Sequence, residues 1–264
     1  GRVPRLGPRT DPAWWLAVRD CSARTSAWRI LAVLGSIWLV AWSGMGGKGP
    51  APQPFVLVAL FLGFGLHVTF KCLVAFEATR RFSEDAANGS LELLLITPLA
   101  ASQIVRGQSR GVMEVLKPPG VALMMVNLLL LVQALLGDSF SGERSPFVTM
   151  FVGGALVLWV DYRALIWMGL YQAIRFRRHN RAALTTIGLI LLPPWLAIVI
   201  LIFLGQANVI RGNQMAYVTL FGWLVGSLAW SWLHLARAKA VLNLRFHSLV
   251  AGEATIASPT RKSS

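Results

Sequence analysis

The sequence is poor in charged residues and poorer still in acidic ones. Only 14% of its 264 residues are charged, and 11 Asp and Glu stand against 25 Lys and Arg. A soluble domain has about 25% charged residues, whereas here 55% of the residues are hydrophobic and the mean hydropathy is +0.60. This shortage of charge excludes an ordinary water-soluble globule.

Cysteine is also scarce, and the residue patterns of catalytic and metal sites are lacking. Cys21 and Cys72 both fall on or near the side predicted below to be cytoplasmic, where reducing conditions disfavour a disulfide, so we interpret them as packing residues. The four histidines are scattered, with no His-x-x-x-His, Cys-x-x-Cys or Gly-x-Ser-x-Gly pattern. We therefore expect no catalytic residue and no metal on this chain.

A nucleotide-binding loop is missing as well. The glycine-rich stretch around Lys48 lacks the first Gly of a P-loop, because Trp42 occupies that position, and no Ser or Thr follows the Lys. No nucleotide or other cofactor is therefore expected on this chain.

What the sequence has in quantity is long apolar runs. Each has roughly 17–25 residues with few or no charges, the length that crosses the hydrocarbon core as a helix. Within each run, apolar residues are distributed around the whole circumference of the predicted helix and do not form a single stripe. The chain is therefore predicted to be an all-α membrane protein with six transmembrane helices, at about 28–46, 54–76, 118–136, 147–171, 182–204 and 215–235.

Basic residues are distributed unequally among the connecting segments. They are frequent before the first run, between the second and third, between the fourth and fifth, and after the sixth, whereas the other loops hold only Lys48, Arg144 and Arg211. By the positive-inside rule, we expect both termini to be cytoplasmic in a bacterial inner (cytoplasmic) membrane. Because the net charge of +14 is distributed by membrane side, we expect a lipid bilayer and no nucleic acid as a partner.

The flanking segments are assigned by composition. Residues 1–11 form a linker rich in Pro, Gly and Arg, which suggests that the chain belongs to a longer protein. Thr10-Asp11-Pro12 is a helix-start signal, and residues 12–25 are predicted to form an amphipathic helix in the membrane interface. A solvent-exposed helix on a soluble neighbour is the alternative. The six-span domain covers 26–240, and 241–264 is a cytoplasmic tail.

The predicted cytoplasmic loop, residues 77–117, carries a pattern of its own. The acidic pair Glu84-Asp85 precedes a helix stop at Asn88-Gly89, a short leucine-rich helix, and a helix restart at Thr97-Pro98. The apolar residues at 91 and 93–96 are too many for an exposed loop, so they must meet membrane, bundle or partner. Docking to a partner and packing against the chain's own spans both remain open.

This loop resembles that of the ABC-2 type permeases, the membrane subunits of ATP-binding-cassette exporters. The similarity lies in Glu84-Asp85, in 89–95, in Thr97-Pro98-Leu99 and in the later Gln-Ile-Val-Arg-Gly-Gln at 103–108. The chain departs from the family pattern at Ala86, Ser90 and Gln108, where Arg, Thr and Lys are common. More loosely, the resemblance covers the whole chain, with its interfacial helix, six spans and long inner loop.

The resemblance implies that the inner loop couples the spans to a separate ABC ATPase subunit, which would hold ATP and Mg. By this resemblance, the residues expected to couple the spans to the ATPase are Glu84, Asp85, Gly89, Ser90, Leu91, Glu92, Leu93, Leu94, Thr97 and Pro98. It also implies a second permease half, either an identical chain or a preceding half of the same polypeptide.

Two ionisable residues lie within the fourth run, where a charge is unfavourable and suggests function. Asp161 and Arg163 are two residues apart and do not face each other on a helix, so each needs another partner, for which Asn127 and Gln133 are candidates. Asp161 and Arg163 then mark either a possible intramembrane polar site on a substrate path, or internal packing polarity, or a span end nearer the surface.

Three other features of the spans are interpreted locally. Lys71 and Glu77 are expected to extend toward the surface or to pair across turns. The double prolines Pro118-Pro119 and Pro193-Pro194 are expected to break their helices locally, which would either shape a cavity or tilt a span.

The function predicted from the resemblance is that of a membrane-spanning permease without an enzymatic site of its own. It would couple ATP hydrolysis by a separate ATPase subunit to export of a substrate across the inner membrane. A non-transporting membrane scaffold that recruits cytoplasmic partners through the same loop is the alternative. An intramembrane enzyme is disfavoured because no acid–base or metal set is present.

Overall fold

The computed structural model describes residues 22–44, 53–87, 101–136, 144–176, 178–206 and 214–250. Apart from Gly44 and Arg178, every described residue lies in a helix, and the all-α class is as predicted. Its helices are α2 (Ser22–Ser43), α3 (Gln53–Ala87), α5 (Ala101–Leu136), α6 (Arg144–Phe176), α7 (His179–Gln206) and α8 (Gln214–Val250).

Five of these helices, α3 and α5 to α8, are long and apolar enough to cross a membrane. The apolar stretch of α2, Trp28–Ser43, is shorter than a full span. The sequence predicted six spans, and the difference concerns the first, whose expected end at residue 46 lies outside the described residues. A multi-pass membrane protein is thus indicated, with five spans in the described part of the chain.

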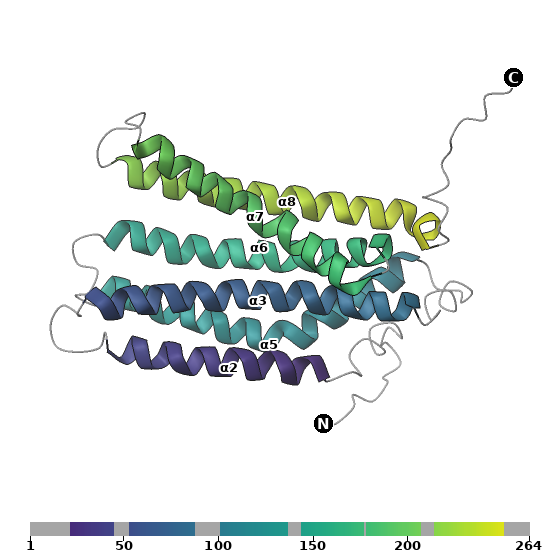
Figure 1. The fold of residues 1–264 in the computed structure, drawn as a ribbon, viewed down its shortest axis with the longest axis horizontal. Coiled ribbons are helices and arrows are strands. Elements are labelled where there is room, and N and C mark those ends of the chain that lie inside the picture. Colours follow the sequence, from purple (N-terminus) through teal and green to yellow (C-terminus); the bar gives the residue numbers. More distant parts are fainter. Residues whose placement is uncertain are drawn as a thin grey trace, which may run out of the picture.

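The helices lie side by side with alternating direction, and α6 occupies the centre (Figure 1). It contacts α3, α5, α7 and α8, whereas α2 packs at the edge against α3 and α5. Residues 164–170 of α6 are all buried, which over two helical turns means that neighbours surround the helix on every side. The core of the bundle is therefore built around α6.

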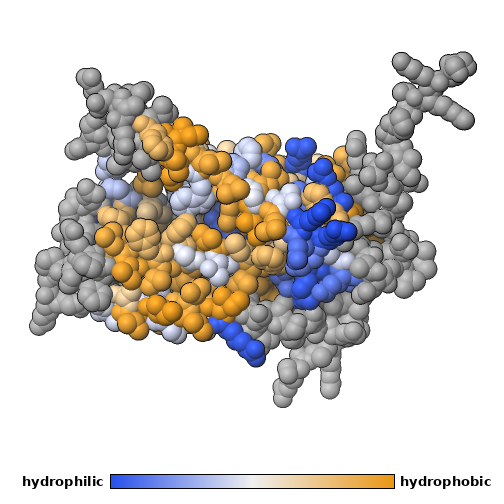
Figure 2. Space-filling model, in the orientation of Figure 1, coloured by the Kyte–Doolittle hydropathy of each residue, from blue (hydrophilic) through white to orange (hydrophobic). Residues whose placement is uncertain are grey.

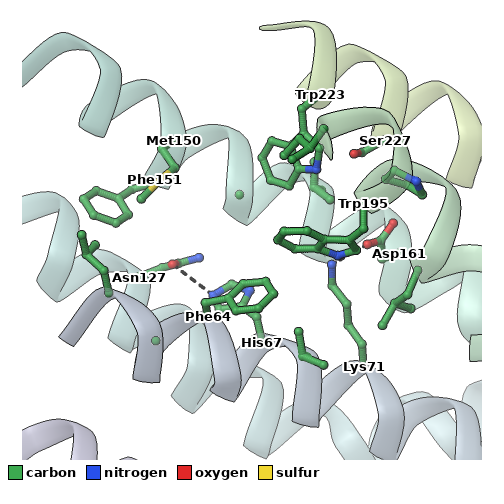
Figure 3. Close-up of a pocket in the computed structure, with 18 of the residues that line it drawn as sticks. Phe64, His67, Lys71, Asn127, Met150, Phe151, Asp161, Trp195, Trp223 and Ser227 are labelled. Carbon is green, nitrogen blue, oxygen red and sulfur yellow. Dashed lines mark hydrogen bonds and ion pairs between the residues drawn. The ribbon is translucent and has the colours of Figure 1, made fainter. Parts of the chain in front are cut away.

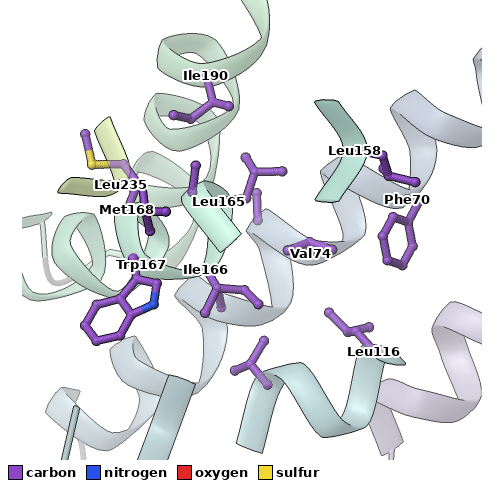
Figure 4. Close-up of a cluster of buried hydrophobic side chains, with 14 of the residues drawn as sticks. Phe70, Val74, Leu116, Leu158, Leu165, Ile166, Trp167, Met168, Ile190 and Leu235 are labelled. Atoms are coloured by element: carbon purple, nitrogen blue, oxygen red, sulfur yellow. The ribbon is translucent and has the colours of Figure 1, made fainter. Parts of the chain in front are cut away.

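The core is a continuous cluster of aliphatic and aromatic side chains. Val74 of α3, Leu116 of α5 and Leu165 of α6 are at most 1% exposed and lie together in it (Figure 4). Outside this core, large apolar side chains also cover the surface, among them Val40 and Phe61 at 72% exposed. Such a surface is unsuited to water and suited to lipid.

Hydrophilic residues gather at one end of the bundle, and an apolar surface covers most of the rest of the view in Figure 2. Helices α3, α6 and α8 end there, and α2, α5 and α7 begin there (Figure 1). The basic residues Arg80, Arg106, Arg175 and Arg181 belong to these helix ends, whereas Arg144 begins α6 at the opposite end. We call the hydrophilic end the basic end.

Several helices extend further than the apolar runs suggested. The second span was expected to end at residue 76 and the third to begin at 118, yet α3 continues to Ala87 and α5 begins at Ala101. Helix α8 likewise continues through 241–250 of the predicted tail. The reason is that polar residues also form helix when they pair one turn apart, as Arg80 does with Glu84.

The segments predicted at the N-terminus are only partly described. Residues 1–11 and 12–21 lie outside the described residues, and 22–25, expected to end the interfacial helix, are the start of α2.

The proline pairs do not interrupt their helices, contrary to expectation. Pro118-Pro119 lies within α5 and Pro193-Pro194 within α7. A proline removes one intrahelical hydrogen bond, but membrane helices tolerate it because neighbouring helices and local adjustments satisfy the freed carbonyl groups.

Candidate functional site

Asp161 forms the centre of a polar cluster inside the helix bundle. It lies in the middle of α6 and is only 5% exposed. One carboxylate oxygen, Oδ2, lies 2.6 Å from Nζ of Lys71 on α3. The other, Oδ1, accepts a 2.5 Å hydrogen bond from Ser231 on α8. Three helices are therefore joined at this carboxylate.

This arrangement corrects the partners expected from the sequence. Asn127 and Gln133 were the candidates for Asp161, but Lys71 and Ser231 are its partners. Lys71 was expected to extend toward the membrane surface or to pair within its own helix. It instead forms an ion pair that connects α3 to α6. Where water is excluded, each charge of such a pair depends on the other, because removing one leaves the other buried and unpaired.

Arg163 does not belong to the same cluster. It is exposed, and its guanidinium carbon lies 4.3 Å from the ring centroid of Trp159 on the same helix. The contact is a cation–π interaction between residues one turn apart. Of the two predicted intramembrane polar residues, Asp161 thus points into the bundle and Arg163 lies on its surface.

A second polar contact lies one helical turn from Lys71. His67 Nε2 of α3 is 3.1 Å from Oδ1 of Asn127 on α5. His67 and Lys71 are four residues apart, so they share one face of α3. That face is directed toward the interior of the bundle (Figure 3).

Both polar contacts line a cavity of about 490 Å³. The size lies within the range of about 300–1,000 Å³ that is usual for small-molecule sites. Its walls come from α3, α5, α6, α7 and α8, and Trp195 and Trp223 lie over its polar part (Figure 3). The lining side chains are mostly apolar, among them Leu57, Phe61, Phe64, Leu130, Met150, Phe151, Ile190 and Ile198.

Three polar atoms of the cavity wall are buried and have no hydrogen-bond partner within the described residues. They are Nδ2 of Asn127, Nε1 of Trp223 and Oγ of Ser227. Buried polar groups are nearly always hydrogen-bonded, and leaving one unpaired is unfavourable by about 1–3 kcal/mol. Three such atoms around one cavity indicate a site that a hydrogen-bonding ligand can complete.

A second polar network lies at the basic end, on the extension of α3. Glu77, 7% exposed, accepts hydrogen bonds from Arg80 and Arg81. Arg80 also donates to both oxygens of Glu84 at 3.1 Å. These pairs are three or four residues apart and hold the polar turns of α3 in helical form. Glu84, predicted as a coupling residue, is thus fixed on a rigid helix.

The extension of α3 is also tied to its neighbours. Gln108 of α5 donates a 3.1 Å hydrogen bond to Oδ2 of Asp85. Thr79 Oγ1 lies 3.2 Å from Nδ1 of His179 on α7, and Phe82 contacts Phe246 of α8 with ring centroids 6.4 Å apart. Asp85, the second predicted coupling residue, therefore lies where α3 and α5 are bonded.

The other predicted coupling residues lie outside the described residues. They are Gly89, Ser90, Leu91, Glu92, Leu93, Leu94, Thr97 and Pro98, all within 88–100.

Sequence reasoning missed most of the cavity. His67, Ser227 and Ser231 were not proposed as site residues, although each lies within an apolar run. The available signal was spacing: His67 and Lys71 on α3, and Ser227 and Ser231 on α8, are each four residues apart. Polar residues at this spacing in an apolar helix mark one polar face.

No metal-binding group of three or more His, Cys, Asp or Glu side chains occurs among the described residues. Comparisons with protein-family models, curated proteins and solved structures find no match to this chain.

Proposed function

We propose that this chain is the membrane permease component of an ABC exporter of the ABC-2 type. Segment 88–100 docks on a separate ABC ATPase subunit, which binds ATP and Mg. The membrane is the bacterial inner membrane, and both termini are cytoplasmic. A second permease half, an identical chain or a preceding half of the same polypeptide, completes the transport path.

The observation that supports this proposal is how segment 88–100 is attached to the bundle. The segment joins α3 to α5, and both helices continue beyond the predicted apolar runs at the basic end. From residue 76 to 87, α3 extends by about 16 Å at the helical rise of 1.5 Å per residue. The bond between Asp85 and Gln108 links the two extensions. A displacement of the segment would therefore move both helices together.

The same extensions transmit movement to the rest of the bundle. Helix α3 is connected to α7 by the contact of Thr79 with His179, and to α8 by the contact of Phe82 with Phe246. Packed helices move as rigid bodies because their interiors are densely filled. ATP-driven closure of the ATPase pair would thus tilt the spans as a unit and alternate access to the path.

The orientation is tested by labelling single cysteines with an impermeant thiol reagent, in a variant in which Cys21 and Cys72 are replaced by Ser. Ser145 lies in the first turn of α6, Arg178 lies two residues beyond its last residue, Phe176, and both are exposed. We expect Ser145→Cys to react in intact cells and Arg178→Cys to react only after the membrane is permeabilised. Labelling of Arg178→Cys from outside would overturn the orientation, and with it the coupling.

The coupling is tested with an ABC ATPase encoded beside this chain. Glu92→Ala is expected to weaken association by about 1–3 kcal/mol, as loss of a partly desolvated charged hydrogen bond does, and to reduce ATP hydrolysis by the complex in liposomes. Gly89→Val should have a larger effect if Gly89 ends α3 in a left-handed conformation. Arg144→Ala, at the opposite end of the bundle, is the matched control.

The outcomes separate the candidate functions. Unchanged association and hydrolysis in both folded variants would mean that segment 88–100 only packs on its own spans. Weakened association of a complex that moves no substrate in any assay would favour the scaffold.

A further inference from the structure

We infer that the cavity between α3, α5, α6, α7 and α8 is a binding site for a single acyl chain with a neutral, hydrogen-bond-accepting carbonyl head. The inference goes beyond the proposed transport function and does not depend on it, because it concerns a site inside one bundle and not the contact with an ATPase.

The shape of the cavity suits a chain. Its lining on α3 runs from Leu57 to Lys71, and these two residues are about 21 Å apart along the helix axis at 1.5 Å per residue. The cavity is therefore long relative to its volume of about 490 Å³. Apolar residues from five helices form most of the wall, so an acyl chain is the natural occupant.

The cavity opens toward the surface that faces lipid. Leu57, Phe61 and Phe64 line it, and these side chains are 54%, 72% and 42% exposed, so the cavity is open along this part of α3. Phe64 meets Trp195 of α7 edge-on, with centroids 4.6 Å apart, across this side of the cavity. A ligand dissolved in the bilayer can therefore enter sideways between α3 and α7.

The polar side chains of the cavity wall determine which head group of a ligand can bind. Asn127 Nδ2 and Trp223 Nε1 are donors only, and the Ser227 hydroxyl can also donate. All three atoms are unpaired within the described residues, and Ser227 and Asn127 are 2% and 8% exposed. A carbonyl oxygen can accept from one or two of these donors, whereas a purely apolar ligand leaves all three unpaired.

The charge balance favours a neutral head. The charged lining residues are Lys71 and Asp161, and they neutralise each other at 2.6 Å. An anionic head would have to displace Asp161 from Lys71, and a cationic one would have to displace Lys71. An acyl ester or a protonated fatty acid places a carbonyl oxygen in the cavity without disturbing the pair.

Gly154 of α6 offers a way to fill the cavity. It lines the cavity, and a Cβ atom at this position would meet nothing within 4 Å. Gly154→Leu should therefore direct a side chain into the space of the acyl chain, with no clash at its Cβ atom. Gly226→Leu on α8 is the matched control, because Gly226 is exposed, does not line the cavity and is also free of contacts within 4 Å.

The experiment uses the whole chain in lipid nanodiscs and two photoactivatable probes, palmitic acid and its monoacylglycerol ester, each with a diazirine in the chain. Adducts are located by mass spectrometry of peptides. We expect adducts on cavity-lining residues of α3 and α6, competed by unlabelled acid and ester but not by an alkane of equal length.

The variants decide between a site and general lipid contact. Gly154→Leu should lower the adduct yield by about tenfold or more, because the side chain fills the site, and Gly226→Leu should leave it unchanged. Ser227→Ala should lower affinity about threefold to tenfold, as the loss of one hydrogen bond does. Ser227 Oγ has no partner within the described residues, so this variant should fold normally.

Four outcomes would overturn the inference. Equal competition by the alkane would mean an apolar void without head recognition. Adducts insensitive to Gly154→Leu would be ordinary contacts with surrounding lipid, and adducts that vanish when the protein forms dimers would assign the opening to a second copy. Competition by the acid alone would contradict the neutral carbonyl head.

Discussion

Lys71→Leu and Asp161→Leu are each expected to lower the free energy of unfolding by about 3–5 kcal/mol, because each leaves the other charge buried and unpaired. Lys71 Nζ and Asp161 Oδ2 are 2.6 Å apart, and Asp161 is only 5% exposed. The carboxylate also holds Ser231, so its loss loosens α8 as well as α3.

The double variant Lys71→Leu with Asp161→Leu is expected to be much less destabilised than either single variant. It removes both charges together, and replacing a buried pair by apolar residues of similar size is often neutral. Unfolding in mixed detergent micelles, followed by circular dichroism, measures the three values. Arg163→Leu is the control, because Arg163 is exposed and its side chain lies over the Trp159 ring, away from the Lys71–Asp161 pair.

A transport assay of the same variants then separates stability from function. If the double variant is as stable as the wild type and still inactive, the pair acts on the substrate path. If it is stable and active, the pair only holds the helices together. A double variant as unstable as the single ones would contradict the direct pairing of Lys71 with Asp161.

Gly169→Ala is expected to be destabilising by about 1–3 kcal/mol, the usual range for overpacking. A Cβ atom at Gly169 of α6 would lie 2.9 Å from Cβ of Ala78 on α3. Ala78 has no rotatable side chain, so the two backbones must separate. This contact between α6 and α3 lies beside the part of α3 that carries Glu84 and Asp85.

Two glycines of the same helix provide matched controls. At Gly153 the added Cβ would meet only the far end of the Leu224 side chain, which can rotate, so Gly153→Ala should have a smaller effect. At Gly154 nothing lies within 4 Å, and Gly154→Ala should stabilise by up to about 1 kcal/mol through helix propensity. Thermal unfolding in one detergent ranks the stabilities of the three variants. Equal effects at all three positions would contradict the close packing of α6 on α3 at Gly169.

The prediction of long apolar helices from the sequence agrees with the structure in segments where residue composition alone is sufficient to predict a helix. A run such as 182–204 has almost no polar residue, so it forms a membrane helix whatever its neighbours are, and α7 covers His179–Gln206. Boundaries at the basic end were less predictable. The helix stop expected at Asn88-Gly89 agrees with the end of α3 at Ala87. The sequence did not show that 77–87 continue the second span as one helix, held by Arg80 with Glu84 and bonded to α5 through Asp85 and Gln108.

The cavity depended on information that one sequence does not contain. Asp161, Lys71 and Ser231 lie on three different helices and are separated by 70 or more residues along the chain. Hydrophobicity predicts that α3, α6 and α8 form, but their apolar residues extend all round and so leave the rotation of each helix about its axis undetermined.

The sequence by itself indicated that the chain forms helices long and apolar enough to cross a membrane and that its basic residues are concentrated in alternate connecting segments, because hydrophobic run length and charge act locally. Only the tertiary structure decided that Asp161 pairs with Lys71, that Arg163 faces outward, and that Asn127, Trp223 and Ser227 surround one cavity. The physical reason is that these contacts follow from how side chains of different helices pack, and packing fixes which face of each helix is turned inward.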